Sequence, residues 1–354
     1  MTALTLPEAL VPLVTDWFAA CGRRSLPWRQ SPDPYRVWLS EIMLQQTRIE
    51  AVIPYYLRFL AVCPDPAALA SLDDDRLMKL WEGLGYYSRA RNLKKAAGIL
   101  VREYGGALPP DYALLRSLPG IGAYTAGAVA SIAFGLPEPA VDGNVLRVVS
   151  RIAALEDDVT LPGTKAAVTE ALRAVYPAGE RAALLTEGLM ELGEEVCVPN
   201  GEPRCASCPV RALCEARQRG EADRFPVRSP KKERRIEERT VLLLRSADGR
   251  VLLCRRGPEG LLAGMWEFPN FPGTLSPEEA EATARALLSD KKTGRAVPLG
   301  TAKHLFTHVE WRMAGYEIAA EALPSDVPFA AVTPGELREE YAVPSAFRAW
   351  VKKV

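Results

Sequence analysis

Apolar residues recur every three or four positions through most of residues 1–225, the spacing of helices that bury one face. The pattern predicts helices over 7–21, 37–59, 93–104, 113–134 and 163–175. Proline and glycine interrupt it, for example at Pro64, Pro66 and Pro119-Gly120, and leave only short connections between the predicted helices. We therefore expect a compact all-α unit in this part of the chain.

The pattern changes after a charged stretch at 226–238, whose few apolar residues are typical of an exposed linker. Strand-like runs follow at 240–245 and 250–256, and the Asp248-Gly249 pair between them favours a β-hairpin. Further strands are predicted at 303–311 and 314–320. Helices are predicted at 345–351 and at 276–289, where Ser276 and Glu279 have the spacing of a capping box. Residues 239–354 thus form a predicted α+β domain.

Composition limits the classes of protein that fit. The 354 residues, 48% of them hydrophobic, suffice for two or three domains with buried cores. Lys plus Arg and Asp plus Glu number 44 each, so net charge alone indicates no nucleic-acid partner. We find no secretory signal and no long apolar run, and therefore expect no membrane span and a reducing, cytoplasmic setting.

Four of the seven cysteines lie in one short run, at Cys197, Cys205, Cys208 and Cys214. Thiolates this close in sequence can all reach one metal centre, and a reducing setting disfavours stable disulfides. The residues alone leave a zinc site, an iron–sulfur cluster and a disulfide knot open, with zinc the default for a Cys-x-x-Cys pair.

Two further motifs carry candidate chemistry. Leu118-Pro119-Gly120-Ile121-Gly122 joins two apolar helices, and its glycines let backbone N–H groups approach a phosphate at the positive end of the next helix. An ordinary helix–helix turn is the alternative. Downstream, Val141-Asp142-Gly143-Asn144 precedes another apolar helix, so Asp142 is either a helix N-cap or a functional carboxylate.

With Leu26-Pro27-Trp28-Arg29 and the segments 39–47 and 81–93, these motifs resemble the MutY-type adenine DNA glycosylases of the helix-hairpin-helix superfamily. The resemblance is dense from Trp17 to Cys214 and looser through the C-terminal domain, which resembles MutT. It implies a multidomain protein. An all-α catalytic region at 1–225 would combine a six-helix barrel-type subdomain at about 30–135 with a cluster subdomain from 1–29 and 136–225. A linker at 226–238 and an α+β, Nudix-like 8-oxoguanine recognition domain at 239–354 would follow.

The resemblance implies a base-excision repair enzyme that flips adenine out of duplex DNA and hydrolyses its N-glycosidic bond. Glu41 would be the general acid that protonates adenine, and Asp142 would stabilise the cationic sugar. Asn144 would orient Asp142, and Tyr124 would lie against it. Bifunctional relatives carry a lysine where Tyr124 stands, so a monofunctional enzyme is expected. Three residues would line the adenine pocket: Trp28, Arg29 and Glu187.

The resemblance also implies a surface that reads the lesion strand. Gln46, Thr47, Leu84 and Tyr86 would surround the base opposite adenine, with Tyr86 inserted into the stack. Gly120 and Gly122 would hold the DNA backbone. In the C-terminal domain the residues that would probe 8-oxoguanine are Phe306, Thr307 and His308; the family more often has serine where Thr307 stands, and threonine adds a methyl group.

For the four cysteines, the resemblance favours a [4Fe–4S] cluster, although the gap between Cys197 and Cys205 is one residue longer than usual in the family. The magnesium-binding box of MutT hydrolases is incomplete, because Leu287, Leu288, Lys291 and Lys292 follow Gly273 and Glu279 where arginine and acids belong. Without carboxylates a hard cation lacks ligands, so this domain is expected to recognise rather than hydrolyse.

Three alternatives remain open: a bifunctional glycosylase of the endonuclease III type, a non-catalytic DNA-binding module whose carboxylates only cap helices, and a nucleotide hydrolase. The expected partner is double-stranded DNA with adenine opposite 8-oxoguanine or guanine. We expect a monomer with no membrane partner, located in the cytoplasm and, in a bacterium, at the nucleoid when bound to DNA.

Overall fold

The computed structural model describes residues 4–31, 33–230, 233–289 and 291–354, so residues 231 and 232 of the predicted linker lie outside the described residues. The chain divides into two compact units. The first comprises Met1–Ser71 and Arg91–Pro230, and the second comprises Leu72–Ala90 and Lys231–Val354. No helix in the described ranges is long and apolar enough to cross a membrane.

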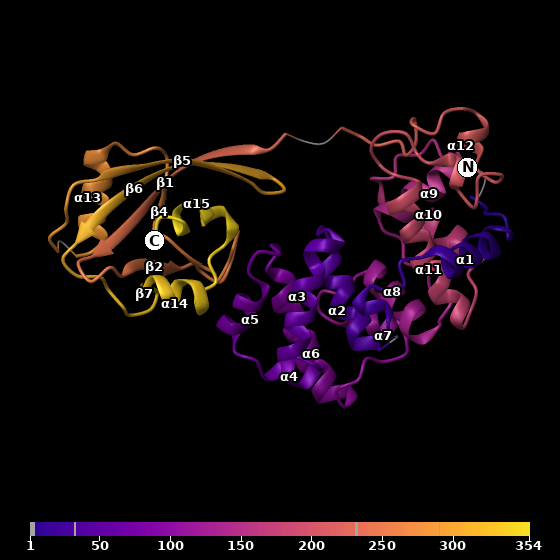
Figure 1. The fold of residues 1–354 in the computed structure, drawn as a ribbon, viewed down its shortest axis with the longest axis horizontal. Coiled ribbons are helices and arrows are strands. Elements are labelled where there is room, and N and C mark those ends of the chain that lie inside the picture. The colour runs from indigo at the N-terminus through magenta and orange to yellow at the C-terminus, as the bar shows by residue number, and fades with distance from the viewer. Residues whose placement is uncertain (1–3, 32, 231–232, 290) are drawn as a thin grey trace. The chain divides into compact units, whose positions relative to one another are not determined.

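The first unit is helical (Figure 1). Its helices are α1 (Leu10–Cys21), η1 (Pro27–Arg29), α2 (Pro34–Leu44), α3 (Ile49–Val62), α4 (Pro66–Ser71), most of α6 (Ser88–Tyr104), α7 (Tyr112–Ser117), α8 (Ala123–Phe134), α9 (Gly143–Ile152), α10 (Pro162–Arg173), α11 (Glu180–Glu191), η2 (Leu192–Val196), η3 (Cys205–Ser207) and α12 (Glu215–Gln218). The single helix predicted over 37–59 is wrong. It is two helices, because the chain turns at Gln46, whose φ is +58°.

A buried core joins α1, α9 and α11. It contains Val14, Val149, Leu185 and Leu189, each no more than 1% exposed. Fully burying such a side chain contributes about 1.5–3 kcal/mol, so this core fixes the position of α9 along its length. The N-terminus of α9, which Asp142 caps, is therefore held by a rigid element.

The second unit contains one seven-stranded sheet. Its strands are β1 (Arg235–Ser246), β2 (Val251–Arg255), β3 (Trp266–Glu267), β4 (Asn270–Pro272), β5 (Val297–Leu305), β6 (Val309–Ala320) and β7 (Phe329–Val332). The order is β3-β2-β1-β6-β5, with β4 beside β1 and β7 beside β2. Strands β1 and β6 are parallel, from Arg235 opposite Val309 to Ser246 opposite Ala320, and the other pairs are antiparallel.

Helices cover both faces of this sheet, as Figure 1 shows. They are α13 (Pro277–Leu287), α14 (Pro334–Glu339), η4 (Ser345–Phe347) and α15 (Arg348–Val351). Successive side chains of β1 enter opposite cores: Val241 and Leu243 pack in the core that contains Phe347 and Trp350, whereas Leu242 and Leu244 pack against α13. Apolar residues on both sides of a strand are what a sheet covered on both faces requires.

Two predicted boundaries in this unit differ from the structure. Strand β1 begins at Arg235, inside the stretch predicted as linker, because its first residues pair with β6. The single strand predicted over 303–311 is wrong, since residues 306–308 form the turn between β5 and β6. The turn contains no glycine or proline, so the sequence does not mark it.

The second unit also includes α5 (Asp74–Trp81) and the beginning of α6 (Ser88–Tyr104). Lys79 of α5 donates hydrogen bonds to the carbonyl groups of Leu337 and Tyr341, and Asp75 forms an ion pair with Arg255 at 2.9 Å. Residues 72–90 were predicted to belong to the barrel-type subdomain, but these contacts place them in the same compact unit as the sheet.

Candidate functional site

A cleft of about 1390 Å³, counted out to its open mouth, lies in the helical unit. Its walls come from η1, α2, α8, α10, α11, η2 and the N-terminus of α9. The structure brings nine predicted site residues to this one cleft: Trp28, Arg29, Glu41, Gln46, Thr47, Tyr124, Asp142, Asn144 and Glu187.

Glu41 is the most deeply buried carboxylate of the cleft wall. It lies on α2 and is 6% exposed, and its Oε2 accepts a hydrogen bond of 2.5 Å from the Tyr124 hydroxyl. Burial raises the pKa of Glu41 to about 7, although the hydrogen bond from Tyr124 and the charge of Arg29 oppose that rise. A carboxyl group with such a pKa can hold and deliver a proton near neutral pH.

Asp142 is the N-cap of α9, which is one of the two roles that its motif predicted. Its Oδ1 accepts a hydrogen bond of 2.7 Å from the Val145 amide, and its Oδ2 accepts one of 3.0 Å from the Asn144 side chain. The same carboxylate lines the cleft. Burial raises the pKa of Asp142, whereas the hydrogen bonds from Val145 and Asn144 lower it. The cap therefore also orients a carboxylate toward the cleft, where it faces the same space as Glu41.

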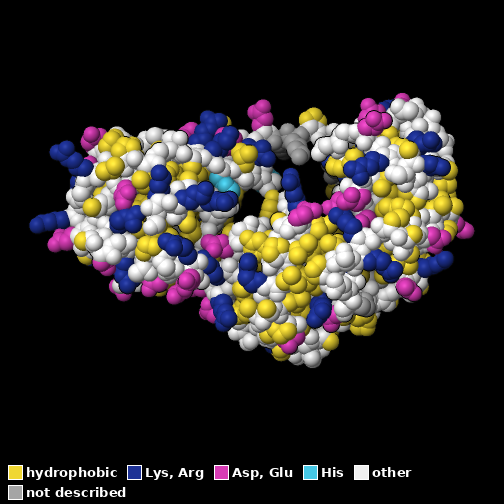
Figure 2. Space-filling model, in the orientation of Figure 1, with side chains coloured by type: hydrophobic (Ala, Val, Ile, Leu, Met, Phe, Trp, Pro, Cys, Tyr) yellow, Lys and Arg dark blue, Asp and Glu magenta, His cyan; other side chains and the backbone are white. Residues whose placement is uncertain are grey.

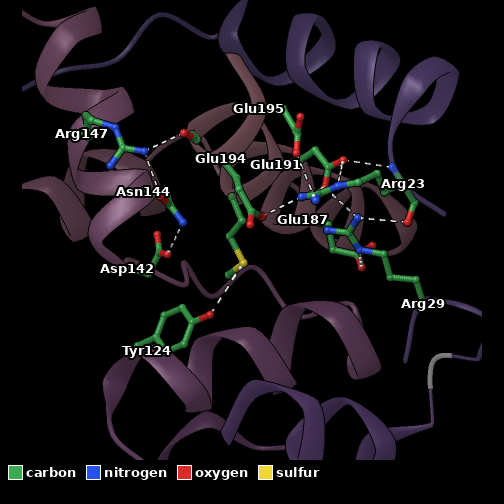
Figure 3. A network of polar contacts seen from close by, with 12 residues as sticks. Arg23, Arg29, Tyr124, Asp142, Asn144, Arg147, Glu187, Glu191, Glu194 and Glu195 are labelled. Atoms are coloured by element: carbon green, nitrogen blue, oxygen red, sulfur yellow. Dashed lines mark hydrogen bonds and ion pairs between the residues drawn. The ribbon is translucent and has the colours of Figure 1, made fainter. Parts of the chain in front are cut away.

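Tyr124 lies in the first turn of α8. Besides its bond to Glu41, its hydroxyl lies 3.8 Å from the Met190 sulfur (Figure 3). Burial, and then the charge of Glu41, raise the pKa of Tyr124 well above its usual value, so the phenol stays protonated and donates. Met190 was not predicted, since an apolar residue inside a helix resembles any core position.

Trp28 and Arg29 form one side of the cleft at η1. The Trp28 ring is buried and packs edge-on against Tyr56, with ring centroids 5.4 Å apart. Arg29 forms ion pairs with Glu187 at 2.9 Å and with Glu191 at 2.8 Å. Burial raises the pKa of Glu187, and the charge of Arg29 opposes that rise.

A second arginine, Arg147, supports Asp142 indirectly by holding Asn144. Arg147 donates to the Asn144 side-chain oxygen at 2.9 Å, to the Gly193 carbonyl at 2.6 Å and to the Cys197 carbonyl at 2.7 Å (Figure 3). Gly193 must lack a side chain, because a Cβ there would lie 2.6 Å from the Cβ of Asn144. The sequence did not reveal Arg147, because two of its partners lie 46 and 50 positions away along the chain.

The four cysteines line one hollow, and Arg151, Arg211 and Arg217 also line it. Arg151 lies 3.2 Å from the Cys197 sulfur. No group of three or more His, Cys, Asp or Glu side chains in the described ranges is arranged to hold a single metal ion. Four soft thiolate donors around one cationic hollow fit an anionic iron–sulfur cluster by their chemistry.

The hairpin between α7 and α8 has the geometry that its glycines predict. Gly120 has a φ of +79°, and a Cβ there would lie 2.7 Å from the Cβ of Asn92. Gly122 is the N-cap of α8, where first-turn N–H groups have no partner within the helix.

The second unit contains the other predicted residues. Tyr86 is exposed at 46%, and its hydroxyl lies 3.0 Å from the Thr307 hydroxyl in the turn between β5 and β6. Phe306 packs edge-on against His304 and Trp311, which anchors this turn, while Thr307 and His308 are exposed. Leu84 is only 6% exposed, so it is not presented to solvent as Tyr86 is.

Comparisons with known proteins agree with this geometry. Residues 39–177 match the HhH-GPD superfamily of base excision DNA repair proteins, and residues 240–353 match the NUDIX domain. The adenine DNA glycosylase of Homo sapiens is 34% identical over 398 aligned positions, which cover 94% of this chain and 71% of that protein. The adenine DNA glycosylase of Buchnera aphidicola subsp. Baizongia pistaciae is 32% identical, with 77% and 75% covered. The chain belongs to the adenine DNA glycosylase family.

Membership in the adenine DNA glycosylase family confirms the predicted fold class and makes the protein a DNA N-glycosylase of base-excision repair that removes adenine from duplex DNA. The helical core also resembles a thermostable thymine-DNA glycosylase of known structure, with 27% identity and a TM-score of 0.54 over 60% of this chain and 96% of that one.

Within the segment that matches the NUDIX domain, two acidic residues of α13 have structural partners. On α13, Glu279 closes the capping box with Ser276, and Glu281 accepts a hydrogen bond from the Ala296 amide at 2.9 Å. Ala280 and Ala284 of the same helix are fully buried against the sheet. Glu279 and Glu281 therefore have structural roles on this helix.

Proposed function

We propose that the protein removes adenine paired with 8-oxoguanine, or with guanine, by hydrolysis and without cutting the strand. One observation carries this proposal: a buried Glu41 with a pKa of about 7 shares a cleft with Asp142. Base release needs a proton donor for the leaving base and a negative charge beside the sugar cation. The cleft supplies both from two carboxylates in different surroundings.

In the proposed mechanism the flipped adenine enters between Glu41 and Asp142. Glu41 donates its proton to the base as the N-glycosidic bond breaks, and the bonding electrons leave with the base. The carboxylate of Asp142, held by Asn144 and the Val145 amide, stabilises the cationic sugar. Water then adds to the sugar carbon, and its proton returns to Glu41. Trp28, Arg29 and Glu187 would surround the base.

We infer that the enzyme is monofunctional because Tyr124 occupies the position of the lysine in bifunctional relatives. A phenol cannot form a Schiff base with the sugar. Among the described residues that line the cleft, Lys165 of α10 is the one lysine. Borohydride should therefore trap no stoichiometric adduct. Trapping that is lost in Lys165→Ala would instead identify this lysine as a lyase residue.

We infer that Tyr86 and Thr307 read the base opposite adenine. Their hydroxyl groups lie 3.0 Å apart, so the wedge and the turn between β5 and β6 form one polar contact within the same unit. Exposed basic residues surround this turn, namely Arg234, Lys303 and Arg312, and Figure 2 shows Lys and Arg side chains beside a histidine on this domain. These cations suit DNA phosphates.

Replacing Thr307 tests this part of the proposal. Thr307→Ala should reduce the preference for adenine opposite 8-oxoguanine over adenine opposite guanine by about tenfold, as expected when about 1.4 kcal/mol of one polar contact is lost. The measurement is the ratio of single-turnover rates on the two duplexes. An unchanged ratio would contradict a role for Thr307 in lesion recognition.

We further infer a [4Fe–4S] cluster held by Cys197, Cys205, Cys208 and Cys214. The cluster would be a structural centre that fixes the loop after α11. Iron and sulfide analysis of the purified protein should give four of each per chain, whereas one zinc per chain would contradict the inference.

For the DNA backbone, we propose that a phosphate binds at Gly120 and Gly122. We also propose that the protein acts as a monomer.

The main experiment uses a duplex with one adenine opposite 8-oxoguanine. The proposal predicts that the strand breaks only after alkali treatment, because hydrolysis leaves an abasic site. Breakage before alkali would favour the bifunctional alternative, and binding without breakage would favour the non-catalytic one. A matched duplex with thymine in place of adenine controls for unspecific cleavage.

A further inference from the structure

Arg29 is held between two carboxylates beside the cleft (Figure 3). Its Nε forms an ion pair with Glu187 at 2.9 Å, its Nη1 donates to Glu191 at 2.8 Å, and its guanidinium lies 5.0 Å from the centre of the Phe18 ring. The side chain of Arg29 is only 9% exposed. A planar guanidinium with fixed donors on two edges and a ring on one face has one orientation.

Glu191 is the better anchored of the two carboxylates. It is the last residue of α11, one turn after Glu187, and its side chain is 3% exposed. It accepts hydrogen bonds from the Arg23 amide at 3.1 Å, from Arg23 Nε at 2.8 Å and from Arg23 Nη2 at 3.1 Å. Burial would raise the pKa of Glu191, but the bonds from Arg23 and Arg29 outweigh it and lower the pKa.

Arg23 is held in turn from its outer side. Its guanidinium forms ion pairs with Glu194 at 2.7 Å and Glu195 at 3.1 Å, and both of these carboxylates are more than 40% exposed. The network therefore runs inward from solvent through Arg23 and Glu191 to Arg29. Only Arg29 and Glu187 of the inner members line the cleft, and Glu191 does not.

We propose that Glu191 is a positioning residue for the adenine pocket, which acts through Arg29 in two ways. It fixes the edge that Arg29 and Glu187 present to the flipped base, and it balances the positive charge of Arg29 close to Glu41. This inference rests on the proposed function, because it assumes that Glu41 is the acid for the leaving adenine. Glu191 itself touches neither the base nor the reacting atoms.

The charges around Glu41 determine how its pKa should change when Glu191 is replaced. Arg29 from η1 and the hydroxyl of Tyr124 from α8 lower the pKa of Glu41, whereas Asp142 at α9 and Glu187 of α11 raise it. Lys165 of α10 and Glu194 of η2 line the same cleft. Removing the charge of Glu191 leaves Arg29 less compensated, so Glu41 would lose its proton at a lower pH.

The test is the single-turnover rate of adenine release as a function of pH in Glu191→Gln. A general acid is active below its pKa and inactive above it, so the alkaline limb should move to lower pH and the rate on that limb should fall about tenfold for each pKa unit lost. Binding of the same duplex should stay within about twofold. Glu138→Gln is the matched control, since it removes the same charge from an ion pair with Arg173 at 3.0 Å that does not line the cleft.

Two results would overturn the proposal: a wild-type profile in Glu191→Gln, or a rate reduced equally at every pH with a lower melting temperature, as a purely structural role predicts. If Glu191→Gln does not fold, Glu191→Asp replaces it. This variant keeps the charge and shortens the reach, so it should keep the pH midpoint and lose maximal rate; a wild-type rate would refute the proposal. Failure of the wild-type enzyme to release adenine would instead refute the proposed function.

Discussion

Glu41 and Asp142 show how two carboxylates in one cleft take different roles. Glu41 has a phenol as its nearest hydrogen-bond donor and is 6% exposed, so burial dominates and its pKa rises to about 7. Burial also raises the pKa of Asp142, but bonds from a backbone amide and from Asn144 at a helix N-terminus oppose that rise. We therefore propose the acid role for Glu41 and the stabilising role for Asp142, whose ionised form has more hydrogen-bond donors.

The bond between Tyr124 and Glu41 gives a prediction with a definite sign. This bond lowers the pKa of Glu41, so Tyr124→Phe should raise that pKa and move the alkaline limb of the rate profile to higher pH, the direction opposite to Glu191→Gln. The measurement is single-turnover adenine release across the same pH range. A limb that moves to lower pH, or not at all, would contradict the assignment of Glu41 as the group that titrates.

At the scale of elements, the site depends on the close passage of η2 against the N-terminus of α9. Gly193 faces Asn144, which bonds to Asp142, and Arg147 ties Asn144 to the Gly193 and Cys197 carbonyls. The backbone that leads into the cysteine loop thereby supports the carboxylate in the cleft.

Gly193→Ala tests that dependence. Its Cβ would lie 2.6 Å from the Cβ of Asn144, so Asn144 must move and Asp142 loses a fixed partner. We expect a loss of about 1–3 kcal/mol in stability and at least a tenfold slower release of adenine. Gly98→Ala is the control, because a Cβ there meets only the end of the Arg102 side chain at 3.4 Å. Equal activity in both variants would show that the site does not depend on the contact between Gly193 and Asn144.

The elements also show what sequence can and cannot predict. The cap at Asp142 and the hairpin at Gly120 were predictable, because caps and positive φ angles depend on residues adjacent in the chain. The break at Gln46 and the turn at 306–308 were not, because neither segment contains a glycine or proline that would mark a turn. The hydrogen-bond network of Glu191 could not be predicted from the sequence either, because Arg23 lies 168 positions away.

At the scale of the whole molecule, the resemblance that the motifs indicated is confirmed by family membership, and with it the helical core and the Nudix-like domain. The structure adds that residues 72–90 belong to the compact unit of the sheet. Tyr86 and Thr307 are therefore parts of one unit, and their contact of 3.0 Å needs no change in position between units. We predict that the wedge and the lesion-reading turn act together.

A double-mutant cycle tests this joint action. Tyr86→Phe and Thr307→Ala each remove one hydroxyl of the shared contact, so the double variant should lose no more preference for 8-oxoguanine than the more affected single variant. The measurement is again the ratio of rates opposite 8-oxoguanine and guanine. Tyr86→Phe keeps the ring for stacking, which separates the hydroxyl from the wedge itself. Fully additive losses would show that the two residues act independently.

The central claim is that Glu41 delivers the proton that releases adenine. Its most direct measurement is free adenine released in a single turnover from a duplex with adenine opposite 8-oxoguanine, compared between wild-type protein and Glu41→Gln at equal saturation with DNA. The account predicts stoichiometric adenine from the wild type and a rate at least about 100-fold lower from the variant, with binding of the duplex preserved. Adenine release by Glu41→Gln at the wild-type rate would contradict it.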